Sequence, residues 1–195
     1  MDRATLKRMA KDQIKGNIGI LFVIELLIVL VSGALNVVPV VGSIAAILVS
    51  GAFSLALVNI YLNLTDGLKP EIGDAFSQLK NFWPAFKLTF LTGLYTFLWA
   101  LLFYIPGIVK ACAYSQAFYI MAEDPTIGAN EAITRSRQLM DGHKMEYFLL
   151  ILSFIGWSIL GAFTFGILYI WLIPYMNATM ANYYRSLTSA YIPAE

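Results

Sequence analysis

The chain has 195 residues, of which 59% are hydrophobic and only 13% are charged, and its formal net charge is +1. Soluble globular domains are about 45–50% apolar and about 25% charged, so this composition excludes an ordinary water-soluble protein. A membrane span needs about 20 apolar residues, and six spans with short connections would use nearly the whole chain. We therefore expect residues 1–195 to form a single all-α membrane domain.

The N-terminal segment, residues 1–16, is basic. Apolar residues recur along it at helical spacing, which predicts an amphipathic helix. Two aspartates accompany five cations, which are Arg3, Lys7, Arg8, Lys11 and Lys15. We expect this helix to lie against anionic lipid headgroups.

Six apolar stretches follow, and each is read as a transmembrane helix. They cover residues 18–38, 43–64, 82–104, 108–121 and 147–163, and a last stretch that ends near residue 184. Short turns at 39–42, 105–107 and 164–166 join them as three hairpins. Two polar connections, 65–81 and 123–146, link one hairpin to the next. The predicted fold is a polytopic helical bundle in which each hairpin is preceded by a short cytoplasmic amphipathic helix.

Positive charge fixes the predicted orientation. Of the 13 lysines and arginines, only Lys110 lies inside an apolar stretch away from the polar segments, and the three turns carry none. Lysine and arginine in short loops are retained in the cytoplasm. Both termini are therefore predicted to be cytoplasmic.

A short pattern recurs near one third of the chain length. Gln13-Ile14-Lys15, Gln78-Leu79-Lys80 and Gln138-Leu139-Met140 are separated by 65 and 60 residues. One interpretation is a threefold duplication of a surface helix followed by a hairpin. The alternative is that hairpins which re-enter the membrane look alike without common origin.

Small residues at four-residue spacing predict where spans approach closely, because lipid offers no hydrophobic drive for helix association. One such stripe lies on the second span and another on the fourth; they are Gly42, Ala46, Ser50 and Ser54, and Gly107, Ala111 and Ser115. We expect the inward-running spans to occupy the centre of the bundle. The same stripes would also suit a contact between two copies of the chain.

Five residues form the candidate polar membrane site: Lys110, Glu25, Gln116, Asn177 and Asn182. Ionisable groups in the hydrocarbon region are costly and often functional, so Lys110 and Glu25 are candidates for a proton or substrate relay. The structural alternative is that Glu25 is protonated or hydrogen-bonded in the bundle while Lys110 extends to the outer interface. Whether the two side chains pair is left open. The amides would line a polar path or join helices.

The sequence offers little for catalysis. The single cysteine, Cys112, excludes an intrachain disulfide, and with only one histidine we expect no Cys/His zinc site. That histidine, His143, is expected to be an interfacial residue where the fifth span begins, and a Ser-His-Asp triad has no other histidine to use. No Walker-type phosphate loop and no HExxH motif is present. We expect no enzyme activity, cofactor, metal or nucleic-acid partner.

Three groups of residues in the second half of the chain resemble a known family. They are Ile105-Pro106-Gly107-Ile108-Val109-Lys110, Gly128-Ala129-Asn130-Glu131-Ala132-Ile133 and Trp171-Leu172-Ile173-Pro174-Tyr175. Their order and spacing are similar to those of the bacterial integral-membrane family catalogued as domain of unknown function 975. The resemblance implies a multi-pass protein of the bacterial plasma membrane, and Lys110 falls on the lysine of the family's IPGI-type turn. A more distant similarity, to the membrane domain of some glycerophosphodiester phosphodiesterases, implies lipid or envelope work.

Two hypotheses for function remain. The first is a non-enzymatic protein that transports, exports or handles a small or amphiphilic substrate, with membrane lipids as its surroundings. The second is a structural module that organises a protein partner, or a homo-oligomer, through its cytoplasmic helices. The candidate partner surface consists of Arg135, Arg137 and Glu131.

Overall fold

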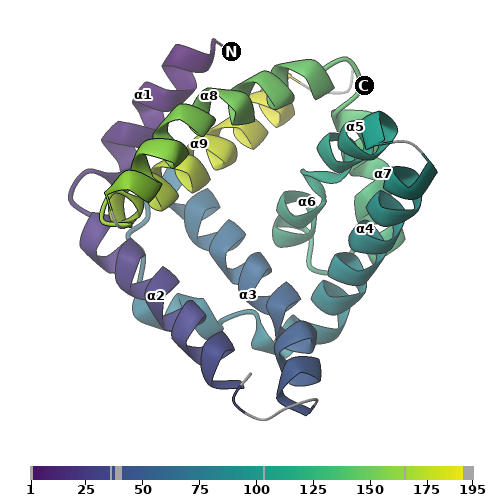
Figure 1. The fold of residues 1–195 in the computed structure, drawn as a ribbon, viewed down its shortest axis with the longest axis horizontal. Coiled ribbons are helices and arrows are strands. Elements are labelled where there is room, and N and C mark those ends of the chain that lie inside the picture. The colour runs from purple at the N-terminus through teal and green to yellow at the C-terminus, as the bar shows by residue number, and fades with distance from the viewer. Residues whose placement is uncertain (1, 36, 38–40, 103, 165, 191–195) are drawn as a thin grey trace.

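The computed structural model describes residues 2–35, 37, 41–102, 104–164 and 166–190. All regular secondary structure in these ranges is helical (Figure 1). The elements are α1 (Arg3–Ile14), α2 (Ile18–Leu35), α3 (Val41–Thr65), the short 3-10 turns η1 (Ile72–Phe76) and η2 (Leu79–Asn81), α4 (Phe82–Leu102), α5 (Tyr104–Tyr114), α6 (Ala117–Glu123), α7 (Ala129–Leu139), α8 (Lys144–Phe163) and α9 (Tyr169–Ala190). The all-α prediction is confirmed.

Three helices in the described part of the chain are long and apolar enough to cross a membrane: α2, α3 from Ile44 onward, and α8. The helices α4 and α9, with 21 and 22 residues, are not among these three. The predicted fourth span, 108–121, is not one continuous helix, because Ser115 and Gln116 form a turn between α5 and α6. The predicted turn residues Pro39, Val40 and Phe165, and the predicted end of the first span at Val38, lie outside the described residues.

Three helical hairpins follow one another along the chain: α2 with α3, α4 with α5, and α8 with α9. In Figure 1 they point outward in three directions, with α2 meeting α3 at the bottom, α4 meeting α5 on the right and α8 meeting α9 on the left. The helix α3 packs against α2, α4, α6 and α9, so it occupies the centre, where the second span was predicted to lie.

The small-residue stripes are only partly used. The close approach of α3 to α4 is at Gly51, where a Cβ atom would lie 2.5 Å from the carbonyl oxygen of Ala85. The helix α5 approaches α4 at Gly107, where a Cβ atom would lie 2.8 Å from the Cα atom of Ala100. Ser54 is exposed, so the predicted stripe on α3 does not pack as a unit. Glycine at these two positions permits contact between helix backbones.

Two of the three predicted surface helices are present as α-helices. The helix α1 buries Leu6, Ala10 and Ile14, and α7 buries one face in the same way. The third segment, 65–81, contains only η1 and η2, since Gly67 at φ 81° and Pro70 disfavour a continuous helix. The apolar face of α1 rests on protein rather than lipid, because α1 packs along α9.

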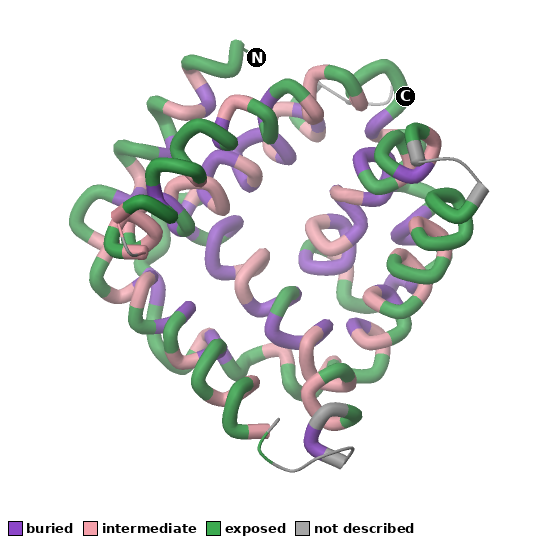
Figure 2. The backbone as a smooth tube through the Cα atoms, in the orientation of Figure 1, coloured by how far each residue is buried: buried purple, intermediate pink, exposed green. Residues whose placement is uncertain are grey.

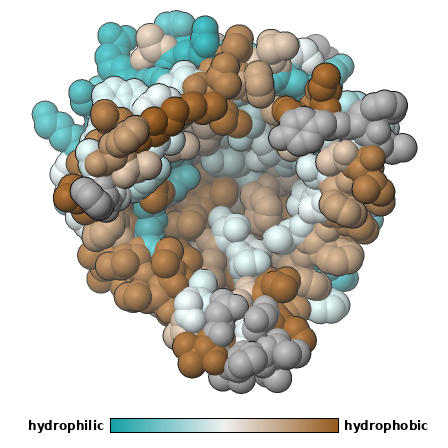
Figure 3. All heavy atoms as spheres, viewed as in Figure 1, coloured by the Kyte–Doolittle hydropathy of each residue, from teal (hydrophilic) through white to brown (hydrophobic). Residues whose placement is uncertain are grey.

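The outer surface is hydrophobic over large areas. Figure 2 shows the buried residues concentrated on the inward sides of the helices, and Figure 3 shows hydrophobic atoms over α2 at the lower left and hydrophilic atoms around α1 at the top. Exposed apolar side chains occur on α2, α4 and α8, among them Val29, Leu30, Phe97, Leu101, Ile159 and Phe163. Apolar exposure of this extent is typical of a surface that contacts lipid.

Candidate functional site

The carboxyl group of Glu25 accepts hydrogen bonds from side chains on two other helices. Its side chain on α2 is 9% exposed, and Oε1 accepts hydrogen bonds from Tyr61 Oη at 2.6 Å and Asn177 Nδ2 at 3.0 Å. Tyr61 lies on α3 and Asn177 on α9. A carboxyl group in an apolar interior is costly unless it is hydrogen-bonded. The three side chains therefore join α2, α3 and α9, and we call them the Glu25 cluster.

Asn182 joins α9 to α1 rather than to the Glu25 cluster. The amides of Asn182 and Gln13 donate to each other at 3.1 and 2.5 Å, and Asn182 Nδ2 also donates to the carbonyl oxygen of Ala178 at 2.8 Å. Every polar atom of the Asn182 amide thus has a partner. The Asn182 amide, which was predicted to line a polar path or to join helices, joins α9 to α1.

Gln116 lies at the break between α5 and α6 and is fully buried. Its Nε2 atom donates to Ser115 Oγ at 2.8 Å, whereas Oε1 has no hydrogen-bond partner among the described residues. Ser136 on α7 supports the break, because its Oγ accepts from the Gln116 backbone N–H at 3.1 Å and donates to the Ala113 carbonyl oxygen at 2.8 Å. The break is therefore held by α7.

Lys110 has different surroundings from the other four candidates. Its Nζ atom lies 4.5 Å from the centroid of the Trp99 ring on α4, and it forms no ion pair within the described ranges. A ring face attracts a cation without neutralising its charge. Glu25 and Lys110 do not pair in the structure, since each has other partners.

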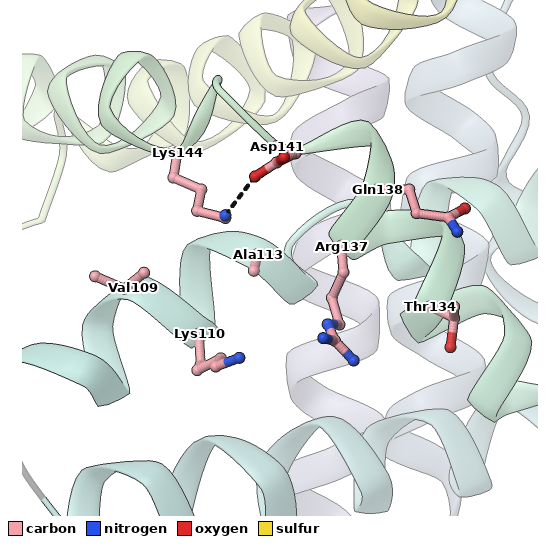
Figure 4. Close-up of a pocket in the computed structure, with 8 residues that line it drawn as sticks. All are labelled: Val109, Lys110, Ala113, Thr134, Arg137, Gln138, Asp141 and Lys144. Carbon is pink, nitrogen blue, oxygen red and sulfur yellow. Dashed lines mark hydrogen bonds and ion pairs between the residues drawn. The ribbon is translucent and has the colours of Figure 1, made fainter.

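Lys110 faces a pocket of about 370 Å³ between α5, α7 and the beginning of α8 (Figure 4). We call it the Lys110 pocket; it is lined by Val109, Lys110, Ala113, Thr134, Arg137, Gln138, Asp141 and Lys144. The side chains of Lys110 and Arg137 approach it from α5 and α7 (Figure 4). Folding thus brings together cations from parts of the sequence that lie 27 and 34 residues from Lys110.

The Lys110 pocket carries more positive than negative charge. Among its lining residues are three cations, Lys110, Arg137 and Lys144, and one carboxylate, Asp141. Lys144 Nζ donates to Asp141 Oδ1 at 3.0 Å, and this hydrogen bond and the lysine charge lower the pKa of Asp141. Arg137, like Lys110, has no ion pair in the described part of the chain. Two cations are left without a counter-charge.

An apolar pocket adjoins the Lys110 pocket. It has a volume of about 390 Å³ and is lined by Ile105, Ile108, Val109, Cys112, Lys144, Met145 and Phe148. Val109 and Lys144 line both pockets. The surface between α5 and α8 therefore changes from cationic to apolar over a short distance, which is the pattern that an amphiphilic molecule requires.

The predicted partner surface is divided by the structure. Arg135 on α7 pairs with Glu131 at 2.6 Å and lies 3.9 Å from Asp124, so its charge is compensated. Arg137 instead lines the Lys110 pocket. Residues two apart on a helix point to different faces, which explains why the two arginines have different neighbours.

A further charged cluster was missed by the sequence analysis. Arg185 on α9 donates to Asp66 and to Glu123, both at 2.6 Å, and to Thr65 Oγ1 at 3.3 Å. Tyr184 Oη donates to the other oxygen of Glu123 at 2.5 Å. These contacts join the C-terminal ends of α3 and α6 to α9. The available signal was that Asp66, Glu123 and Arg185 each lie just beyond the end of a predicted span.

No group of three histidine, cysteine or acidic residues within the described residues could hold a metal ion.

The comparisons with known proteins identify a family. No curated protein and no solved structure matches the chain. The family described as Protein of unknown function (DUF975) matches residues 1–113 and 102–191, which together cover nearly the whole chain. The chain belongs to this family.

Proposed function

We propose that the chain is a six-span protein of the bacterial plasma membrane, with both termini in the cytoplasm, that handles an amphiphilic substrate without catalysing a reaction. Handling here means transport or export of the substrate, or work on lipid or envelope components. The distribution of lysine and arginine supports the orientation. In this topology α4, α5 with α6, and α9 supply the spans that accompany α2, α3 and α8.

The observation that carries the proposal is the pair of adjoining pockets beside Lys110. One is cationic, the other apolar, and both open between α5 and the start of α8. A substrate with a charged end and an apolar end would satisfy both surfaces at once.

The proposal is tested with purified protein in liposomes. We expect wild-type protein to accelerate the transfer of fluorescent lipids between leaflets or the flux of amphiphilic solutes, and Lys110→Met to abolish the acceleration. Lys80→Met is the matched control, because Lys80 is exposed within η2 and does not line the Lys110 pocket. Absence of any transfer or flux that depends on Lys110 would overturn the proposal.

The orientation has its own test. After Cys112→Ser removes the single thiol, one cysteine is introduced beside each predicted outer turn, at Val37, Ile105 or Ile167, which are at least 71% exposed. We expect membrane-impermeant maleimide to label all three from outside intact cells. Labelling of any of them only from the cytoplasmic side contradicts the six-span arrangement.

A second candidate function is a module that organises a membrane partner or a homo-oligomer. The exposed charges of Arg135 and Glu131 on α7 favour it, since their pair lies at the surface. Charge reversal of Arg135 and Arg137 would then abolish partner capture, whereas Lys110→Met would leave the capture and the phenotype intact. Under the amphiphile proposal, Lys110→Met has the larger effect.

A further inference from the structure

The identity of the charged end of the substrate follows from the cations of the Lys110 pocket. An arginine guanidinium donates two parallel hydrogen bonds to a phosphate or carboxylate, and a lysine ammonium adds a point charge. Arg137 and Lys110 approach the pocket from different helices without an acidic partner among the described residues (Figure 4). Such an arrangement favours an anion between them.

The position of Lys110 is already restrained without an anion. Its ammonium group lies over the Trp99 ring at 4.5 Å, which orients the side chain while its charge stays available. Asp141 compensates only the nearby Lys144. A group with a single negative charge would therefore enter a pocket that still contains two uncompensated cations.

The apolar pocket decides between a lipid and a free anion. Apart from Lys144, all of its lining side chains are apolar, and it shares Val109 and Lys144 with the Lys110 pocket. Ile105 and Met145 on its edge are 73% and 66% exposed, so the pocket opens toward the outer, apolar surface. A free phosphate ion would use only the cationic half, whereas a phospholipid would fill both.

Resting on the proposed function, we propose that the substrate class is an anionic phospholipid, whose phosphate lies between Lys110 and Arg137 and whose acyl chain lies along Ile108 and Met145. Basic pockets between helices are suited to anionic headgroups. A zwitterionic lipid is disfavoured because its positive headgroup would meet Lys144 and Arg137. The uncompensated cations favour a headgroup with a net negative charge.

The test measures dissociation constants of lipids for the full chain purified in a nonionic detergent, by native mass spectrometry. The probes are phosphatidylglycerol, phosphatidylcholine with the same acyl chains, and inorganic phosphate. We expect phosphatidylglycerol to bind about tenfold more tightly than phosphatidylcholine, and Lys110→Met and Arg137→Gln each to remove most of that preference. Inorganic phosphate should compete only weakly.

Matched controls keep the result specific to the pocket. Lys80→Met removes an exposed lysine within η2, away from both pockets, and should bind as the wild type does. Phe148→Ala should weaken both lipids equally, because Phe148 lines only the apolar pocket of the two. Thermal unfolding of every variant excludes misfolding as the cause.

Three results would overturn the inference: equal binding of the two lipids, an unchanged preference in both pocket variants, or inorganic phosphate binding as tightly as the lipid. The two proposals fail separately. Lipid transfer that depends on Lys110 without any preference for anionic lipid overturns this inference alone. A preference for anionic lipid that depends on Lys110, without any transfer or flux, supports this inference and overturns the proposed function.

Discussion

Glu25 and Lys110 are both ionisable residues within apolar stretches, yet the fold treats them in opposite ways. Glu25 is 9% exposed and accepts hydrogen bonds from Tyr61 and Asn177 inside the protein. Lys110 faces an open pocket with Arg137, and within the described residues its only partner is the face of the Trp99 ring. A charged group whose partners are all supplied by the fold serves stability, whereas cations left uncompensated at a pocket favour ligand binding.

The largest expected effect is the loss of the Glu25 carboxyl group. Glu25→Ala leaves the Tyr61 hydroxyl and the Asn177 amide without their acceptor in an apolar core, and it should lower the free energy of unfolding by about 3 kcal/mol. Lys110→Met should cost less than about 1 kcal/mol, the typical value of a cation–π contact. Denaturant unfolding in detergent micelles measures both. Equal losses of stability would remove the distinction between the two sites.

Tyr61→Phe tests the same cluster from the donor side. It removes one hydrogen bond but leaves the Asn177 donor to Glu25, so the expected loss is about 1 kcal/mol. A double-mutant cycle of Tyr61→Phe with Asn177→Leu should show coupling, because both donors share Oε1 of Glu25. Additive losses would mean that the two contacts are independent and that the cluster is not a unit.

The sequence predicted local features of the molecule better than its contacts. Helix positions followed from apolar runs, and the amphipathic helix expected in the connection 123–146 corresponds to α7. Glu25 and Lys110 stood out because charge is rare in such stretches. The partners of both were not predictable, since Tyr61 is one of many tyrosines and Asn177 lies 152 residues from Glu25. The Lys110 pocket depends on how α7 packs against α5, which periodicity does not specify.

The sequence also did not predict where the helices are interrupted. The Ser115–Gln116 break interrupts a run that reads as one apolar stretch, and its stabilising contact comes from Ser136 on a different helix. The region before α4 reads as helical if its glycines and proline are overlooked. The threefold pattern remains a prediction: Gln13 and Gln138 lie in the last turns of α1 and α7, but Gln78 precedes a 3-10 turn.

Gln116 shares one property with each of the two sites: it is buried, as Glu25 is, and within the described residues it has an uncompensated polar group, as Lys110 does. It is buried like Glu25, but one of its polar atoms has no partner in the described part of the chain. Gln116→Met removes the hydrogen bond to Ser115 and also the unpaired Oε1, so the two effects should nearly cancel, within about 1 kcal/mol. Unfolding and lipid transfer should both be near wild type. A large loss of transfer with unchanged stability would instead place Gln116 in the substrate path.

The smallest effect concerns Asp141, the carboxylate of the Lys110 pocket. Lys144 lowers its pKa, so the contact between them stabilises the fold at every pH above the ordinary aspartate value. That contribution is lost only as the pH falls through the lowered pKa, and stability should therefore not change between about pH 7 and 5 on this account. Asp141 also opposes an anion, because its charge offsets that of Lys144. Asp141→Asn should tighten phosphatidylglycerol binding about two- to threefold at pH 7, since exposed charges interact weakly in water. Weaker binding by Asp141→Asn would show that the pocket needs this carboxylate to position Lys144, and would place Lys144 in the headgroup site together with Lys110 and Arg137.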